Sequence, residues 1–189
     1  WLKECFLDLQ NAFVAFDGSM LISAIVGLID EKTGVLYFYS AEHPFLVLYR
    51  DGIALFIGQK ISLPKIGNPL IGNFSILTFQ LEPGDTIIIG SDGKDDLVIS
   101  DQAGKKEINF DENLFLEYVK KNDASIPEIV GDIEKTGKIT DDLSLLKISY
   151  HKQQEMLEGE TGHGADIAQI KALMKEGKDQ MTATMEVMR

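Results

Sequence analysis

The fold is decided by the stretch EPGDTIIIGSDG, residues 82–93. Its Pro-Gly pair is typical of a turn, and the apolar run that follows, residues 86–90, is typical of a short buried strand. An Asp-Gly pair, Asp92-Gly93, comes directly after that run. The pattern therefore predicts a strand that carries one carboxylate to the edge of a sheet.

A second acidic pair, Asp141-Asp142, stands immediately before another apolar run, residues 143–148. Asp-Gly pairs are also common in hairpin turns, so Asp92-Gly93 taken alone favours a simple turn. Neighbouring strands lie only about 5 Å apart, and two carboxylates at strand ends can therefore converge on one hard cation. Both interpretations, paired turns and a shared cation, follow from the residues.

Composition limits the classes of function. The chain has 189 residues, which suits one domain with a full core and perhaps an appendage. Thirty acidic residues against 18 basic ones give a formal net charge of −12, which argues against a nucleic-acid partner and is compatible with binding divalent cations.

Cysteine content and hydropathy bear on location. Cys5 is the single cysteine, so no intrachain disulfide can form, and a reducing cytoplasmic location is expected. No window approaches the roughly twenty apolar residues of a membrane-spanning helix, so no membrane contact is expected. The chain begins with Trp1 and not with Met, which suggests a fragment.

Periodicity predicts the order of the elements. Residues 2–16 have the apolar spacing of an amphipathic helix, and two hairpins are expected over 20–41 and 45–57. A strand over 74–81 precedes the turn at Pro83, and residues 94–106 are polar and irregular apart from 97–99. Two helices, one beginning at Asp111 and one spanning 127–137, come before the last strand, 143–148. This order predicts an α+β domain in which antiparallel sheet is covered by helices.

Several motifs in this order resemble the metal-dependent serine/threonine phosphatases of the PPM class, in their SpoIIE-like and RsbU-like branch. The match runs from about Met20 to Tyr150. Besides the Pro-Gly-Asp turn, Asp92-Gly93 and Asp141-Asp142, residues 40–44 (SAEHP) resemble that branch's Ala-Gly-His-Pro strand end. Residues 67–72 (GNPLIG) resemble its Gly-x-Pro-Leu-Gly loop.

The resemblance implies an antiparallel β-sandwich flanked by helices, in α-β-β-α layers. It implies that Asp92 and Asp141 are ligands of Mn²⁺ or Mg²⁺, with two ions in the complete domain, and that the substrate is a phosphorylated protein in bacterial signalling. Asp142 is expected beside the ligands or in solvent, and Asp95 and Asp96 are expected to be solvated surface residues. His43 is expected to have a structural role in a turn, although Glu42 stands where the family usually has glycine.

One expected motif is missing. The family's Asp-x-Ser/Thr-Gly-His-Gly metal motif would precede Trp1 in the resembled arrangement, so the domain is expected to be incomplete at its N-terminus. Thr161-Gly162-His163-Gly164 resembles the end of that motif but is out of order, and a Gly-rich linker explains it more simply. Two alternatives stay open: a non-catalytic scaffold with the same fold, and an unrelated β-rich binding module.

The last part of the chain differs from the rest. The phosphatase-like domain is predicted to cover residues 1–150, and residues 151–189 are predicted to form an acidic, Gly-rich linker and an amphipathic, Met-rich helix. This helix either docks on its own domain or, over residues 165–189, serves as a dimerising or partner-binding surface.

Overall fold

The computed structural model describes residues 1–59, 63–70, 72–102 and 105–151. The predicted linker and Met-rich helix, and the Thr161-Gly162-His163-Gly164 segment within them, lie outside the described residues. The domain boundary at residue 150 and the role of residues 165–189 therefore stay predictions.

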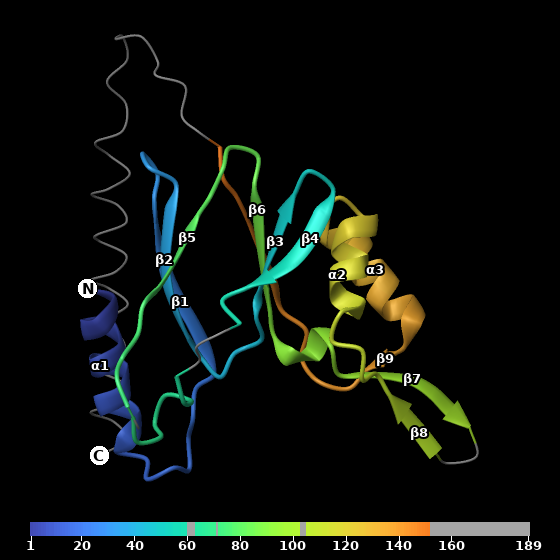
Figure 1. The fold of residues 1–189 in the computed structure, drawn as a ribbon. Helices are drawn as coiled ribbons and strands as arrows, with labels where there is room; N and C mark the ends of the chain where they lie inside the picture. The colour runs from blue at the N-terminus through green and yellow to red at the C-terminus, as the bar shows by residue number, and fades with distance from the viewer. Residues whose placement is uncertain (60–62, 71, 103–104, 152–189) are drawn as a thin grey trace, which may run out of the picture. The chain divides into compact units, whose positions relative to one another are not determined.

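Two antiparallel sheets form the centre of the described domain (Figure 1). The first has the order β1-β2-β5, with β1 at Ala24–Asp30, β2 at Val35–Ala41 and β5 at Leu77–Gln80. The second has the order β10-β6-β3-β4, with bounds β3 Leu46–Arg50, β4 Ile53–Ile57, β6 Thr86–Gly90 and β10 Leu145–Ser149.

The side chains between the sheets form one apolar core. Alternate residues of a strand face opposite sides of its sheet, so Leu46, Leu48 and Ile87 face this core while Val47 and Ile88 face away. Both faces of β3 and β6 are therefore covered, which explains why their sequences are nearly continuous apolar runs. The core residues shared by the two sheets are Leu36, Phe38, Leu46, Leu48, Ile57, Leu81, Ile87 and Tyr150.

Helices cover the outer faces of the sandwich. Helix α1, Leu2–Val14, packs Leu2 and Phe6 against Tyr39 of the first sheet. Helices α2, Leu114–Lys121, and α3, Ile126–Thr136, cover the second sheet, where Val47 and Ile88 meet Phe115, Val119, Ile129 and Ile133. The predicted α-β-β-α layering is thus confirmed.

The hairpin between β3 and β4 follows its turn chemistry. Asp51 and Gly52 adopt φ values of 49° and 77°, both in the left-handed region. A two-residue turn with positive φ at both positions matches the right-handed twist of the flanking strands, which is why Asp-Gly predicted this hairpin correctly.

The start of β6 is held by a buried ion pair. Asp85 is 1% exposed, and the Arg50 guanidinium donates to both of its oxygens, at 2.7 and 2.6 Å. The Glu82 backbone N–H donates to the same carboxylate at 2.8 Å. Burial raises the pKa of Asp85, but Arg50 and the Glu82 N–H together outweigh it and leave that pKa below the usual value.

The prediction of an irregular segment over residues 94–106 is wrong. A 3₁₀ turn, η1 at Asp92–Lys94, is followed by strands β7, Leu97–Gln102, and β8, Lys105–Ile108, which form a small sheet with β9, Lys138–Ile139. Ile99 and Ile108 are 41% and 46% exposed, so this hairpin buries little apolar surface. A hairpin of that kind lacks the apolar alternation by which strands are found in sequence.

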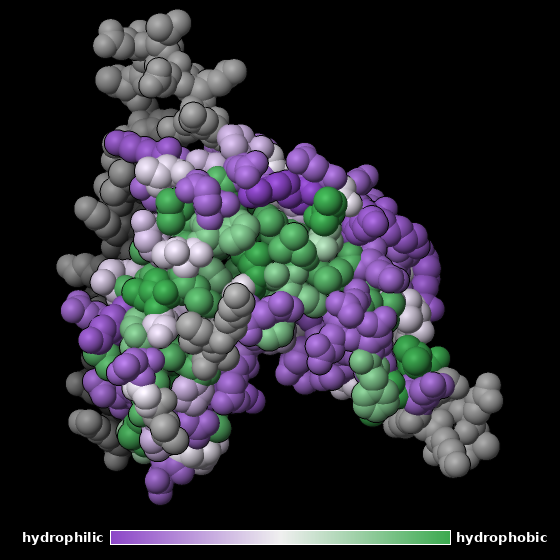
Figure 2. All heavy atoms as spheres, viewed as in Figure 1, coloured by the Kyte–Doolittle hydropathy of each residue, from purple (hydrophilic) through white to green (hydrophobic). Residues whose placement is uncertain are grey.

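Two surface properties complete the description. Figure 2 shows an apolar area on the side of the sandwich where β5 and β4 are the edge strands, and a groove of about 510 Å³ lies there between Leu55, Phe56 and Leu77. None of the helices in the described ranges has the length and hydropathy needed to cross a membrane.

Candidate metal centre

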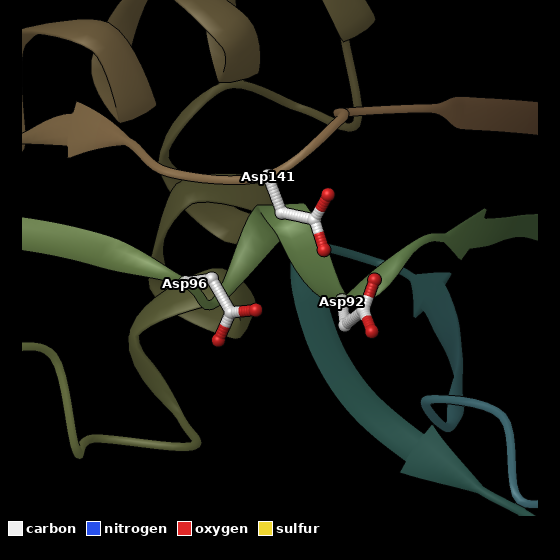
Figure 3. Close-up of side chains that lie close together, drawn as sticks. All are labelled: Asp92, Asp96 and Asp141. Carbon is white, nitrogen blue, oxygen red and sulfur yellow. The ribbon is translucent and has the colours of Figure 1, made fainter.

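Three carboxylates from different segments meet at one end of the second sheet (Figure 3). Asp92 is the first residue of η1, directly after β6, and Asp96 lies between η1 and β7. Asp141 lies in the loop between β9 and β10. One oxygen from each carboxylate lies within 4.8 Å of an oxygen from each of the other two.

The pairing of β6 with β10 brings Asp92 and Asp141 together. The strands are antiparallel with Gly90 opposite Leu145, so the end of β6 and the start of β10 lie at the same edge. Ser91 extends this pairing: its N–H donates to the Ser144 carbonyl at 3.0 Å, and its Oγ accepts from the Ser144 N–H at 2.9 Å. The Ser91 hydroxyl also donates to the Asp142 carbonyl at 2.9 Å.

Asp96 is held to both neighbouring segments through its main chain. Its N–H donates to the Asp92 carbonyl at 3.1 Å, and its carbonyl accepts from the N–H and hydroxyl of Thr140 at 3.1 and 2.9 Å. Thr140 directly precedes Asp141. The same hydrogen bonds therefore set the positions of all three carboxylates.

Gly93 allows the two loops to come this close. A Cβ atom at this position would lie 2.5 Å from the carbonyl oxygen of Asp142 and 3.2 Å from that of Asp141. Both atoms belong to the backbone and cannot rotate away. The Asp-Gly pair is thus required here for close approach of two chains, and not for a hairpin turn.

The donor set suits a hard divalent cation. Carboxylate oxygens are the ligands that Mg²⁺ and Mn²⁺ prefer. Among the described residues, no lysine, arginine or histidine forms an ion pair with Asp92, Asp96 or Asp141. Three adjacent negative charges without a cationic partner repel one another, and a divalent cation would remove that repulsion.

The acidic residues predicted from the sequence lie partly where they were expected. Asp92 and Asp141 were predicted to converge, and they do, which weighs against an unrelated module with distant turns. Asp96 was expected in solvent, but it is half-buried and its carboxylate belongs to the cluster. Its position four residues after Asp92, in the short segment between η1 and β7, was the signal that could have found it. Asp142 is exposed, and its N–H donates to Asp141 Oδ1 at 2.7 Å.

Asp95 also departs from the sequence prediction. It forms an ion pair with Lys94, which is only 3% exposed, and the Lys94 ammonium lies 5.0 Å from the ring centroid of Phe115. Lys94 is therefore buried between one carboxylate and one aromatic ring. Nothing in the sequence distinguished this lysine from a solvated one.

His43 lies outside the carboxylate cluster, at the end of β2. Its ring Nδ1 lies 3.0 Å from the Pro44 carbonyl, and its own carbonyl accepts from the Ser40 hydroxyl at 3.4 Å. These contacts are those of a turn residue. Glu42 adopts φ 42°, a left-handed conformation that accounts for the glycine usual at this position in the resembled family.

Comparison with known proteins places the fold. A family model described as Stage II sporulation protein E (SpoIIE) matches residues 2–151. The SiaA PP2C domain of Pseudomonas aeruginosa is 18% identical with a TM-score of 0.60, over 77% of this chain and 58% of that one. The RsbU and RsbW domains of a Mycobacterium tuberculosis protein are 19% identical with a TM-score of 0.59, over 92% and 50%.

A third structure, the phosphatase domain of SpoIIE from Bacillus subtilis, is 15% identical with a TM-score of 0.50, over 84% of this chain and 70% of that one. At these identities the likeness concerns the fold. This chain spans 58% and 50% of the length of the first two structures. The comparison with curated proteins found no match.

Proposed function

Because this chain belongs to the SpoIIE family, we propose that it is part of a metal-dependent protein serine/threonine phosphatase in bacterial signalling. The observation that carries the proposal is the cluster of Asp92, Asp96 and Asp141 at the end of the second sheet. The substrate is a phosphorylated regulatory protein, and the location is the cytoplasm.

Asp92, Asp96 and Asp141 would hold Mn²⁺ or Mg²⁺. Such ions would lower the pKa of bound water and neutralise charge on the phosphoryl oxygens. The hydrogen bonds of Ser91 and Thr140 fix the loops that carry these carboxylates, so the ligands are positioned before any ion arrives. Asp92 and Asp141 are exposed, which leaves the site open to a protein substrate.

A second candidate function is a non-catalytic scaffold with the same fold. It is favoured by one observation: the 189 residues contain no Asp-x-Ser/Thr-Gly-His-Gly motif. Without that aspartate the remaining carboxylates would hold metal more weakly, and catalysis would need a residue that this chain does not supply. Metal binding separates the two candidates, because a scaffold has no need of a cation site.

Calorimetric titration with Mn²⁺ of the longer protein that contains this chain tests the proposal. We expect binding at micromolar concentration, about −8 kcal/mol, which is lost in Asp92→Asn because one of three charged ligands is removed. Asp142→Asn is the matched control: it removes a neighbouring carboxylate outside the cluster and should leave the affinity unchanged. Absence of Mn²⁺ binding to the unmodified longer protein would favour the scaffold.

Activity is tested in the longer protein that contains this chain. Asp92→Asn should abolish Mn²⁺-dependent hydrolysis of a phosphoserine or phosphothreonine protein and leave the circular dichroism spectrum unchanged, because Asp92 is exposed. Unchanged turnover in Asp92→Asn would exclude the assignment of this residue to the metal centre.

A further inference from the structure

A pocket of about 380 Å³ is lined in part by Lys94 and Asp95, which lie in sequence between Asp92 and Asp96 of the carboxylate cluster. Its walls come from the loop before β3, from β4, from the residues after η1 and from the segment between β8 and α2. The lining residues are Pro44, Phe45, Phe56, Lys94, Asp95, Asn109, Phe110, Asp111 and Glu112.

The pocket and the cluster share one short segment, residues 92–96. Asp92 and Asp96 belong to the carboxylate cluster, while Lys94 and Asp95 line the pocket. Adjacent Cα atoms are about 3.8 Å apart, so the two sites are separated by no more than about 11 Å of chain. The cluster and the pocket therefore lie on one short segment of the chain.

The charge of the pocket is negative. Among the described residues, Lys94 is the only cationic one in the lining, and its ammonium is already paired with Asp95 and packed over Phe115. Asp111 and Glu112 form no ion pair among the described residues. Asp95 Oδ1 is buried and accepts no hydrogen bond from the described part of the chain. In the described part of its lining, the pocket thus has two carboxylates without an ion-pair partner, of which Asp111 accepts from the Asn113 N–H at 2.9 Å, and no unpaired cation.

Aromatic rings form the rest of the wall. Phe45 and Phe56 pack edge to face with centroids 6.0 Å apart, and Phe110 is 88% exposed. A phenylalanine so exposed contributes little to the core. Aromatic faces next to carboxylates are the surroundings in which cationic groups bind, because the ring quadrupole and the negative charges attract the same ligand.

We propose that this pocket binds the side chain of an arginine or lysine near the phosphorylated residue of the substrate. The proposal rests on the phosphatase function proposed above and specifies its substrate class: phosphoproteins with a basic flanking residue. An extended peptide advances about 3.3 Å per residue, so the basic residue is expected about two to four positions from the phosphoresidue.

The pocket can be tested without metal or phosphate. N-acetyl-arginine methylamide is titrated into the full chain carrying ¹³C-labelled phenylalanine, and its norleucine analogue is titrated in parallel. We expect the arginine compound to shift the Phe110 ring signals, identified by their loss in Phe110→Leu, at about 10 mM. Equal shifts from the norleucine compound would show an apolar pocket and overturn the proposal, as would no shift from either compound.

Charge variants establish which residues attract the ligand. The double variant Asp111→Asn, Glu112→Gln should weaken binding of the arginine compound about fivefold to tenfold, since both uncompensated carboxylates are neutralised. Glu117→Gln, an exposed neutralisation on α2 outside the pocket, should leave binding unchanged. Equal weakening in Glu117→Gln would assign the effect to the overall charge of −12 and overturn the proposal.

The link to the phosphatase function is tested with phosphothreonine peptides in the presence of Mn²⁺. One arginine is moved along an otherwise uncharged peptide, and we expect affinity to rise about tenfold at one or two positions and to fall back in the double variant. Equal affinity at every arginine position would overturn the role in substrate selection. If Mn²⁺ does not strengthen phosphopeptide binding, the result counts against the metal centre. The titration with N-acetyl-arginine methylamide would still test whether the pocket binds a cationic side chain.

Discussion

The two ends of β6 carry acidic groups in opposite electrostatic situations. At its start, Asp85 is 1% exposed and Arg50 binds both of its oxygens. At its far end, the carboxylate of Asp92 lies close to those of Asp96 and Asp141. No cationic side chain among the described residues forms an ion pair with these three. The charge of Asp85 is therefore balanced inside the fold. The charges of the carboxylate cluster are not balanced by any described side chain.

The presence or absence of a cationic partner distinguishes an acidic residue that stabilises the fold from one that is a candidate for binding. A buried carboxylate matched by a guanidinium and a backbone N–H stabilises the fold, and its removal leaves an unpaired buried charge. A group of carboxylates without a cationic partner destabilises the fold slightly through repulsion, which makes it a candidate for cation binding. The same substitution, Asp to Asn, should therefore have opposite effects at the two ends of the strand.

The largest effect is expected from Asp85→Asn. It removes the buried one of the two carboxylate partners of Arg50, and we expect a loss of about 3 kcal/mol in the free energy of unfolding, or about 6–12 °C in Tm. Urea unfolding measures the change. Glu82→Gln is the control. The Glu82 side chain also pairs with Arg50 but is 63% exposed, so this ion pair should contribute less than about 1 kcal/mol to the free energy of unfolding.

Acid titration provides an independent check on Asp85. Its pKa in the folded chain lies below the usual value, so its contribution is present at neutral pH and is lost as the pH falls below about 4 towards the folded pKa. Asp85→Asn should therefore lose less stability on acidification than the unmodified chain. Parallel acid profiles for the two proteins would contradict the role given to this ion pair.

A smaller effect is expected from Gly93→Ala at the other end. The new Cβ would lie 2.5 Å from the Asp142 carbonyl oxygen, so the Asp141 loop has to move and the carboxylates separate. We expect a loss of about 2 kcal/mol and at least tenfold weaker Mn²⁺ binding. Differential scanning calorimetry and Mn²⁺ titration measure the two changes.

Gly131→Ala is the matched control for that substitution. Gly131 lies within α3, and a Cβ there meets no atom within 4 Å, so alanine should stabilise the chain by about 0.5–1 kcal/mol through its helix propensity. Similar destabilisation by both glycine substitutions would show that close packing at Gly93 is not the cause.

The smallest change in Tm is expected from Asp141→Asn without metal, and the sign of this change is the most informative. Removing one of three repelling charges should leave Tm unchanged or raise it by less than about 2 °C, in contrast to the large loss from Asp85→Asn. Thermal unfolding in EDTA measures this, and added Mn²⁺ should raise the Tm of the unmodified chain alone. A marked fall in Tm in EDTA would mean that Asp141 is structural.

Much of the layered fold could be predicted from the sequence. Helix α1, both hairpins, strand β6 and helices α2 and α3 have strong local signals: apolar spacing, Asp-Gly and Pro-Gly turns, and helix starts. The small sheet of β7, β8 and β9 could not be predicted, because its hairpin buries little apolar surface and β9 has only two residues.

The sequence by itself determined the order of the elements, the Pro-Gly turn before β6 and the two aspartates at strand ends. Only the tertiary structure decided that Asp96 joins them, that Lys94 is buried by Asp95, and that Phe45, Phe56 and Phe110 surround one pocket. The reason is physical: turns and strands depend on neighbours along the chain, whereas charge compensation depends on which distant segments the strand register brings into contact.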